Sequence, residues 1–234
     1  MLLKEKELLE YIKCPLRFNI IKNGIDIDNE KTFNQHVYDV AKYLYLSTLD
    51  NPITNSKILK NKWDSICMHN KENITPKQVT EGWGLIYRTF EYIYYNKIKF
   101  IDINQSYKIE IPETGVCLTG VLDPIIDRGD HIEIFISSYS KKVPEKIDID
   151  TKIKHTIDAY VIKQLYKKDV VIKYHSFTKG IELYTLRDEK SFKRLESIIK
   201  NVGKAINDNI IYPRETYMCS SCLAREFCIE WTGK

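Results

Sequence analysis

Four of the six cysteines lie near the two ends of the chain, and this placement constrains the fold more than any other feature. Cys219, Cys222 and Cys228 follow one another near the C-terminus, and Cys14 lies near the N-terminus. Three thiols at this spacing can bind one metal centre, and Cys14 could supply a fourth ligand. Four thiolates suit either a [4Fe-4S] cluster or structural zinc. The alternative is that they are ordinary core cysteines.

A shared metal centre would join the two ends of the chain. Between Cys14 and the C-terminal cysteines it would close a loop of some two hundred residues. In the loop-entropy treatment of cross-links, such a closure is worth roughly 5 kcal/mol. We therefore expect the centre to act as a structural clasp. Cys67 and Cys117 have no partner at ligand spacing and are expected to be buried thiols.

Length and composition indicate one domain over residues 1–234. The chain is 43% apolar, enough for one substantial core. Its net charge of +4 is too small to indicate a polyanionic partner by itself. The N-terminus lacks the apolar run of a signal peptide, and no stretch reaches membrane-spanning length. We expect an intracellular, cytoplasmic protein with no membrane partner, whose cysteines are reduced thiols or metal ligands.

The hydrophobic period divides the chain into a mainly helical part (1–100), an α/β core (101–210) and a cysteine loop (211–234). Apolar residues at three- and four-residue spacing predict helices at 4–22 with a break at Cys14-Pro15, and at 31–48, 77–99, 152–168 and 190–207, with 51–76 partly helical. Alternating runs predict a three-stranded antiparallel meander of Ser106–Ile111, Val116–Ile126 and Ile132–Ser138, then a hairpin of 170–177 and 181–187.

Two stretches that bracket the chain resemble motifs of a known nuclease family. Leu-Leu-Glu-Tyr-Ile-Lys-Cys-Pro-Leu-Arg-Phe, which contains Cys14, resembles the opening motif of RecB-like nucleases. Tyr-Pro-Arg-Glu-Thr-Tyr-Met-Cys-Ser-Ser-Cys-Leu-Ala-Arg-Glu-Phe-Cys resembles their closing motif. The arrangement is similar to the Fe–S exonucleases associated with CRISPR adaptation and to the AddB nuclease domain. The resemblance implies an α/β fold of the PD-(D/E)XK restriction-endonuclease type, a mixed sheet flanked by helices, with N-terminal helical additions and a C-terminal Fe–S cluster loop.

Between the brackets, the resemblance implies four catalytic motifs, of which the third departs from the family. His36 fits the helical histidine, although the glycine usual shortly before it is absent, and Asp123 in Gly-Val-Leu-Asp fits the second motif. The third motif requires an acid-x-Lys pair, but Ser138 and Ser140 occupy the two places. In the fourth motif Tyr160 matches, while Thr156 replaces the glutamine.

The loss of the acid-x-Lys pair weakens the case for catalysis. Metal-dependent phosphodiester hydrolysis needs at least two carboxylates to hold a hard cation, so His36 and Asp123 alone would bind Mn²⁺ or Mg²⁺ weakly. Glu133 lies on the same strand as Ser138 but on the opposite face, and only a β-bulge would return it to the site. In that case Lys141 or Lys142 could reach in.

Three functions follow from this pattern. The first is a DNA-binding but cleavage-silent subunit of a DNA-processing complex. The second is an active Mn²⁺- or Mg²⁺-dependent exonuclease with relocated residues, and the third is a structural scaffold without DNA binding. The family implies single-stranded DNA or duplex ends as ligand, and protein partners in a recombination, replication or CRISPR-like complex. Candidate DNA contacts are Tyr139, Lys141, Lys142, Lys146, Lys152 and Lys154; the alternative is that the lysines form a solvated loop.

Overall fold

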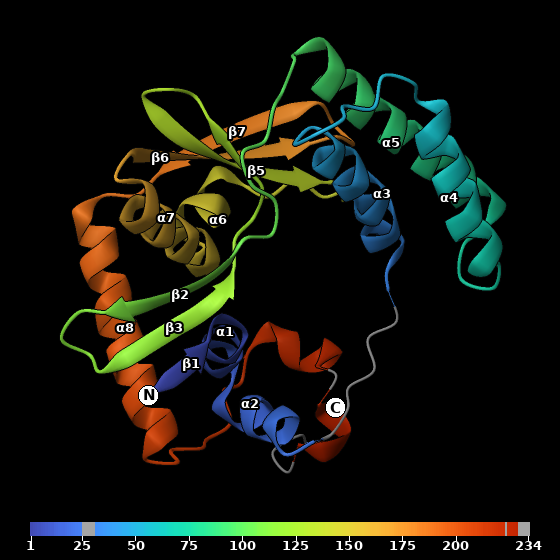
Figure 1. Ribbon diagram of the computed structural model, residues 1–234. Helices are drawn as coiled ribbons and strands as arrows, with labels where there is room; N and C mark the ends of the chain where they lie inside the picture. Colours follow the sequence, from blue (N-terminus) through green and yellow to red (C-terminus); the bar gives the residue numbers. More distant parts are fainter. Residues whose placement is uncertain (25–30, 223, 229–234) are drawn as a thin grey trace. The chain divides into compact units, whose positions relative to one another are not determined.

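The computed structural model describes residues 1–24, 31–222 and 224–228, apart from the side chains of residues 217 and 218 (Figure 1). The chain forms two compact units. The first unit combines Met1–Asn29, Ser106–Val121 and Asp188–Lys234. The second combines Glu30–Gln105 and Leu122–Arg187.

The first unit contains both ends of the chain and a three-stranded mixed sheet. The strand order is β1-β3-β2, with β1 parallel and β2 antiparallel to β3. Its elements are β1 (Leu2–Lys4), α1 (Glu5–Lys13), α2 (Pro15–Lys22), β2 (Ser106–Ile111), β3 (Val116–Val121), α8 (Glu189–Asn207) and the 3₁₀ turns η1 (Tyr217–Ser221) and η2 (Arg225–Phe227).

The break between α1 and α2 follows from the local sequence. Cys14 is extended, with φ −165°, and it ends α1 and begins α2. Pro15 then occupies the first position of α2, where its missing N–H costs no hydrogen bond. This confirms the predicted interruption, and it leaves Cys14 outside both helices.

A close packing contact explains Gly120 in β3. The buried carboxylate of Glu5 accepts a hydrogen bond from the Tyr107 hydroxyl at 2.8 Å. A Cβ atom on Gly120 would lie 2.5 Å from both the Glu5 Oε2 and the Tyr107 hydroxyl. The glycine therefore leaves room for this buried hydrogen bond.

We expect Gly120→Ala to destabilise the protein by about 1–3 kcal/mol, because the new methyl group must displace the Glu5–Tyr107 pair. Chemical denaturation of the variant beside Gly84→Ala separates this steric effect from the general effect of alanine. A Cβ atom on Gly84 would meet nothing closer than 3.7 Å. Equal losses in the two variants would contradict the packing explanation.

The second unit contains a four-stranded mixed sheet in the order β4-β5-β6-β7. β5 and β6 are parallel, and the outer pairs are antiparallel. Its elements are α3 (Phe33–Ser47), α4 (Lys57–His69), α5 (Pro76–Tyr95), β4 (Ile125–Asp127), β5 (His131–Ser138), α6 (Lys146–Thr151), α7 (Ile153–Tyr166), β6 (Asp169–Ser176) and β7 (Ile181–Leu186).

Helices cover both faces of this sheet (Figure 1). The helices α3, α4 and α5 share one hydrophobic core with Phe135, Tyr139 and Phe177. Next to Phe135 on β5, Ile134 faces the other side because strand residues alternate. There α7 packs against β5 and β6 and buries Ile157 and Val161.

The predicted helices and the C-terminal hairpin are confirmed, but the predicted meander is wrong. Residues 116–126 do not form one strand: β3 ends at Val121, and β4 begins at Ile125 in the other sheet. Pro124 lies in the break and has no N–H to donate to a continuing ladder. Its carbonyl instead accepts from the Phe135 N–H at 2.8 Å. β5 then pairs in parallel with β6 through the α6–α7 crossover, which hydrophobic alternation alone does not reveal.

Among the described helices, none combines the length and apolar character that a membrane crossing requires.

Candidate functional site

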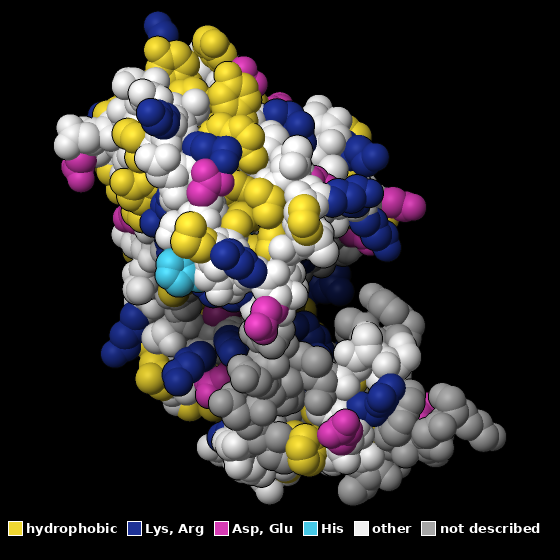
Figure 2. All heavy atoms as spheres, turned by 90° about the vertical axis from the view of Figure 1, so that its right-hand side faces the viewer, with side chains coloured by type: hydrophobic (Ala, Val, Ile, Leu, Met, Phe, Trp, Pro, Cys, Tyr) yellow, Lys and Arg dark blue, Asp and Glu magenta, His cyan; other side chains and the backbone are white. Residues whose placement is uncertain are grey.

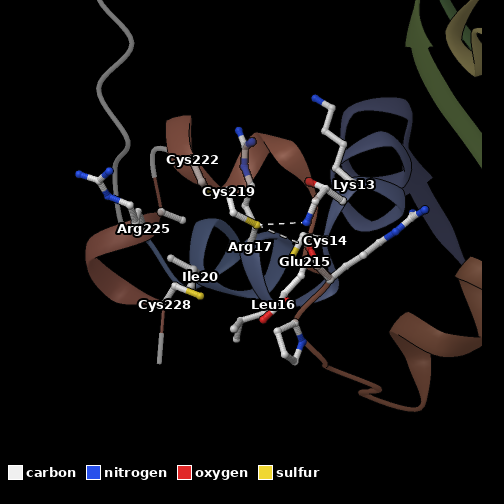
Figure 3. A pocket seen from close by; sticks show the side chains of 14 residues that line it. Lys13, Cys14, Leu16, Arg17, Ile20, Glu215, Cys219, Cys222, Arg225 and Cys228 are labelled. Carbon is white, nitrogen blue, oxygen red and sulfur yellow. Dashed lines mark hydrogen bonds between the residues drawn. The ribbon is translucent and has the colours of Figure 1, made fainter. Parts of the chain in front are cut away.

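The four cysteines singled out from the sequence line one cavity in the first unit. The cavity measures about 250 Å³ and is lined by Cys14, Cys219, Cys222 and Cys228 among others (Figure 3). Cys14 comes from the α1–α2 junction, Cys219 lies in η1, and the other two directly follow η1 and η2. The fold thus brings side chains from both ends of the sequence around one space.

Two short 3₁₀ turns shape the C-terminal loop that holds three of the cysteines. The backbone N–H of Cys222 donates to the Cys219 carbonyl at 3.2 Å, that of Arg225 to Cys222 at 3.0 Å, and that of Cys228 to Arg225 at 3.1 Å. Each bond spans three residues, as in a 3₁₀ turn. Cys219 and Cys222 lie in and directly after η1, and Cys228 follows the separate turn η2.

The charges around the cavity favour an anionic group. Lys13, Arg17, Arg214 and Arg225 line it together with Glu215 and the cysteines, and Glu10 pairs with both Lys13 and Arg17. The positive side chains therefore outnumber the acids. The backbone N–H of Thr216 also points at the Cys219 sulfur, with N···Sγ 3.4 Å.

Within the described ranges, no three Cys, His, Asp or Glu side chains lie close enough to hold a single metal ion. A tetrahedral zinc ion with Zn–S bonds of about 2.3 Å holds its sulfurs only about 3.8 Å apart. A cluster of several irons and sulfides fills a wider gap than one ion. The choice between a cluster and zinc stays a prediction.

Three charged side chains of the second unit meet at the position of the second nuclease motif. The Lys154 ammonium lies 3.9 Å from Asp123 Oδ2 and forms a close ion pair with Asp158. The Asp158 side chain is fully buried, whereas Asp123 is about one-third exposed. Lys154 therefore places its positive charge between two carboxylates.

The third motif contributes no charge in this structure. Ser138 ends β5, and its hydroxyl accepts from the Ser140 N–H at 3.4 Å. Glu133 is buried and pairs with Arg128 at 2.8 Å. The β5–β6 register runs one residue to one residue from His131 to Ser138, so no bulge turns Glu133 toward the face of Ser138.

His36 is buried on α3. Its imidazole forms no hydrogen bond or ion pair with the residues that the structure describes. Tyr38 on α3 is close enough to Asp123 to feel its charge. Burial raises the pKa of the Tyr38 hydroxyl, and the negative charge of Asp123 raises it further. Residues two apart on a helix point in different directions. The structure thus brings Asp123 close to Lys154, which in turn pairs with Asp158.

The predicted aromatic DNA contact is wrong. Tyr139 is 4% exposed, and its hydroxyl lies 3.2 Å from the Tyr45 hydroxyl and 3.3 Å from Thr89 Oγ1. A ring enclosed by α3 and α5 cannot stack on a base. Tyr160 on α7 is equally buried.

Three of the five predicted phosphate contacts are engaged by acids. Lys141 pairs with Glu81 at 3.0 Å, and Lys146 pairs with Asp150 at 2.9 Å. Lys154 is held by Asp158. Lys142 and Lys152 are exposed. The lysine run therefore resembles a solvated, internally paired segment more than a phosphate-binding patch.

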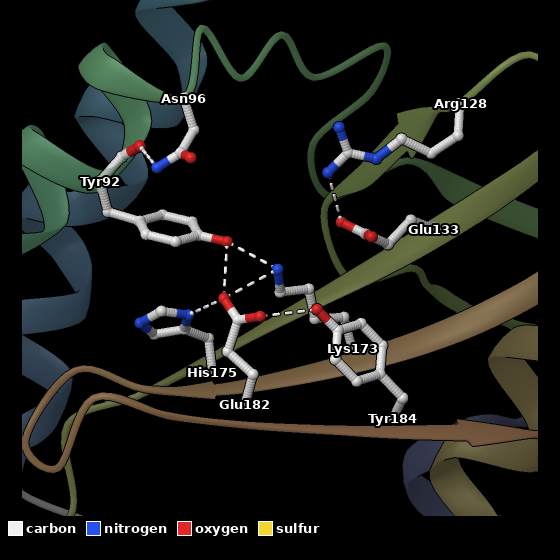
Figure 4. A network of polar contacts seen from close by, with 8 residues as sticks. All are labelled: Tyr92, Asn96, Arg128, Glu133, Lys173, His175, Glu182 and Tyr184. Atoms are coloured by element: carbon white, nitrogen blue, oxygen red, sulfur yellow. Dashed lines mark hydrogen bonds and ion pairs between the residues drawn. The ribbon is translucent and has the colours of Figure 1, made fainter.

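Two groups of residues were not predicted from the sequence. One is Asp158, which stands between apolar Ile157 and Ala159 and four residues after Lys154, a spacing at which ion pairs form on helices. The other is a network centred on Glu182 (Figure 4). Glu182 Oε1 lies 2.9 Å from Lys173 Nζ, from the Tyr92 hydroxyl and from His175 Nδ1, and Oε2 lies 2.6 Å from the Tyr184 hydroxyl.

The Glu182 network is a satisfied structural cluster. Burial acts to raise the pKa of Glu182, but hydrogen bonds from Tyr184, Lys173 and Tyr92 lower it to about 2. These donors are directed at the carboxylate and occupy its acceptor positions, which leaves little room for a ligand. We therefore assign the network to the packing of α5 on the sheet.

His155 on α7 gives the protein a pH-dependent stability. Burial lowers its pKa to about 3, and the positive charges of Lys152, Arg187 and Lys154 act in the same direction. Since the unfolded imidazole titrates near 6.5, acid favours the unfolded state between pH 6.5 and about 3. We expect the free energy of unfolding to fall by up to about 1.4 kcal/mol per pH unit in that window because of this group.

Denaturation midpoints at pH 6.5, 5.5 and 4.5 for wild type and His155→Leu measure this contribution as a difference of slopes. The exposed His69→Leu serves as control. A wild-type slope retained in His155→Leu would show that the histidine is not held neutral in the folded protein.

The two mixed sheets with flanking helices form a nuclease-like α/β fold. The fold is similar to that of a protein from Eubacterium rectale, provisionally named an exonuclease, with a TM-score of 0.60 and 12% identity over 94% of this chain and 86% of that one. Rai1 of Scheffersomyces stipitis matches with a TM-score of only 0.27, at 11% identity over 92% of this chain and 72% of that one, and carries no weight. Neither known protein families nor curated proteins gave a match. The finer placement in the Fe–S branch of RecB-like nucleases stays a prediction.

Proposed function

We propose that this chain is a nucleic-acid-binding protein of the nuclease fold that does not cleave its ligand. The observation that carries the proposal is the state of the two acids, Asp123 and Asp158, which are both engaged by the ammonium of Lys154. The shared fold supports the nucleic-acid part, since the Eubacterium rectale protein is named for a nuclease activity.

Electrostatics explain why this arrangement opposes cleavage. A divalent cation needs carboxylate oxygens that are free to enter its coordination shell. Lys154 already neutralises one charge between the two acids, and Asp158 is fully buried on α7. Ser138 and Ser140 offer only neutral hydroxyls in place of the missing acid and lysine.

A second candidate function has a specific observation in its favour. Two carboxylates and one lysine are the groups that a metal-dependent nuclease uses, and here they converge from different parts of the second unit. If a metal displaced the ammonium, Asp123 and Asp158 would hold it and Lys154 would stabilise the attacked phosphate. This candidate predicts Mn²⁺- or Mg²⁺-dependent cleavage that requires all three residues.

The four cysteines are proposed to hold a [4Fe-4S] cluster. The proposal is supported by their shared cavity and by the excess of positive over negative side chains that line it. When bound, the cluster would supply a structural cross-link. Cys14 would anchor the α1–α2 junction, and the other three cysteines would order the C-terminal loop against it. Zinc is the alternative, which metal analysis of the purified protein decides.

A protein that binds without cutting fits best as a subunit of a complex. We propose partners in recombination, replication or a CRISPR-like assembly, where the chain could also occupy the place of an active relative. A scaffold without nucleic-acid binding is the remaining alternative.

Fluorescence anisotropy with labelled single-stranded and blunt duplex oligonucleotides tests the binding part. We expect salt-dependent binding, with affinity falling at least about tenfold between 50 and 200 mM salt, because phosphate contacts release counterions. No binding to either oligonucleotide at 50 mM salt would leave only the scaffold alternative.

A further inference from the structure

The helix α5 carries an unusual row of aromatic rings. Trp83, Tyr87, Phe90 and Tyr94 follow at intervals of four, three and four residues, which places them on one side of the helix. Their ring centroids are 5.8, 6.3 and 5.5 Å apart in turn, and Tyr95 continues the row at 5.4 Å from Tyr94. The rings thus form a continuous aromatic track along the C-terminal part of α5.

The outer rings of this aromatic track are not used by the core. Tyr87, Tyr94 and Tyr95 are 39%, 48% and 73% exposed, whereas Leu85 and Ile86 of the same helix are almost fully buried. Exposed apolar surface of this kind, gathered in one place, marks a binding surface more often than a structural one.

The surroundings of the aromatic track are positively charged. Residues 57–99 hold eight Lys and Arg against four Asp and Glu, an excess equal to the net charge of +4 of the whole chain. Lys62 lies 4.6 Å from the centre of the Tyr43 ring, which is 41% exposed on α3. Lys60 lies 5.7 Å from the centre of the Trp83 ring and also pairs with Asp64. Figure 2 views the molecule from the right-hand side of Figure 1, where α4 and α5 are labelled. It shows hydrophobic side chains gathered among Lys and Arg.

We propose that the aromatic track of α5 is a stacking surface for the bases of a single-stranded nucleic acid. This inference rests on the proposed function and gives it a location and a ligand class. Unpaired bases expose π-faces that stack on Tyr and Trp, while neighbouring lysines attract the phosphates. The same mixture is a poor protein interface, because interface cores favour aromatic residues but are depleted of Lys. A duplex keeps its bases stacked internally and cannot use the rings.

The test compares two double variants of the full chain in anisotropy titrations with a labelled oligo-dT strand. Tyr87→Ala with Tyr94→Ala removes two rings and is expected to weaken binding at least about tenfold, since each stacked base contributes roughly a fivefold or larger factor. Tyr87→Phe with Tyr94→Phe keeps the rings and is expected to bind within about twofold of wild type. Circular dichroism and thermal melting of both variants confirm that the fold is intact.

The outcomes separate this inference from the proposed function. If wild type binds the strand and the alanine variant binds it equally well, the aromatic track is not the site, and the proposed function stands. Sedimentation adds a second check. If wild type is a dimer, the alanine variant is a monomer and both bind the strand equally well, the aromatic track is a dimer interface and the inference is overturned. If wild type binds the blunt duplex but not the single strand, the inference falls and the proposed function stands; if it binds neither, both fall.

Discussion

Cys14→Ser is expected to remove the proposed metal centre and to lower the melting temperature of the anaerobically purified protein by some 10–20 °C. Cys14 is the cavity-lining thiol that comes from the N-terminal end of the sequence. Losing it opens a cross-link of some two hundred residues. Such a link is worth roughly 5 kcal/mol by loop entropy, and in a chain of this size 1 kcal/mol shifts the midpoint by about 2–4 °C.

Cys117→Ser is the matched control, because Cys117 is a partly buried thiol that does not line the cavity. Iron, sulfide and zinc content is measured for both variants and for wild type, together with visible absorption and the melting curve. Equal metal content and equal melting points in the two variants would remove Cys14 from the site. Stoichiometric zinc in place of iron would keep the clasp but replace the cluster.

Lys154→Met is expected to cost about 3 kcal/mol of stability, the second largest effect. The side chain of Asp158 has no exposed surface, so removal of its ammonium partner leaves a charge inside the protein. Breaking a buried pair from one side typically costs 3–5 kcal/mol. Lys154 is itself about one-fifth exposed, which places the estimate at the lower end.

The chain offers a close control on the preceding helix. Lys146 and Asp150 form the same i,i+4 pair on α6, but Lys146 is 60% exposed, so Lys146→Met is expected to cost less than about 1 kcal/mol. Adding Asp158→Asn to Lys154→Met should restore part of the loss, since it removes the uncompensated charge. Similar denaturation midpoints for the two Lys→Met variants would mean that the Lys154 pair is not desolvated.

The helical part of the fold was predictable from periodicity, and the sheets were not. The helices at 33–47, 76–95 and 189–207 lie within about four residues of their predicted bounds, because each carries a strong amphipathic pattern. Alternation of apolar and polar residues identifies a strand but not the strand with which it pairs. For that reason it merges β3 and β4 into one predicted strand, although Pro124 lies at the point where the chain changes sheets.

The candidate site was likewise predictable from the sequence only in part. Spacing along the chain selected four cysteines, and the fold places all four around one cavity. Burial is a property of the tertiary structure, so sequence could not tell that Tyr139 lies in the core. Asp158 shows the converse: an acid flanked by Ile157 and Ala159 on a buried helix needs a cation, and the lysine four residues earlier was the available signal.

The central claim is binding without cleavage, and one assay tests it most directly. The anaerobically purified protein is incubated with end-labelled single- and double-stranded DNA and with Mn²⁺ or Mg²⁺, beside Asp123→Ala, while retained DNA is read in the same samples. We predict bound but intact DNA with both proteins. Metal-dependent degradation by wild type that disappears in Asp123→Ala would contradict the claim and would establish Asp123, Asp158 and Lys154 as a working nuclease site.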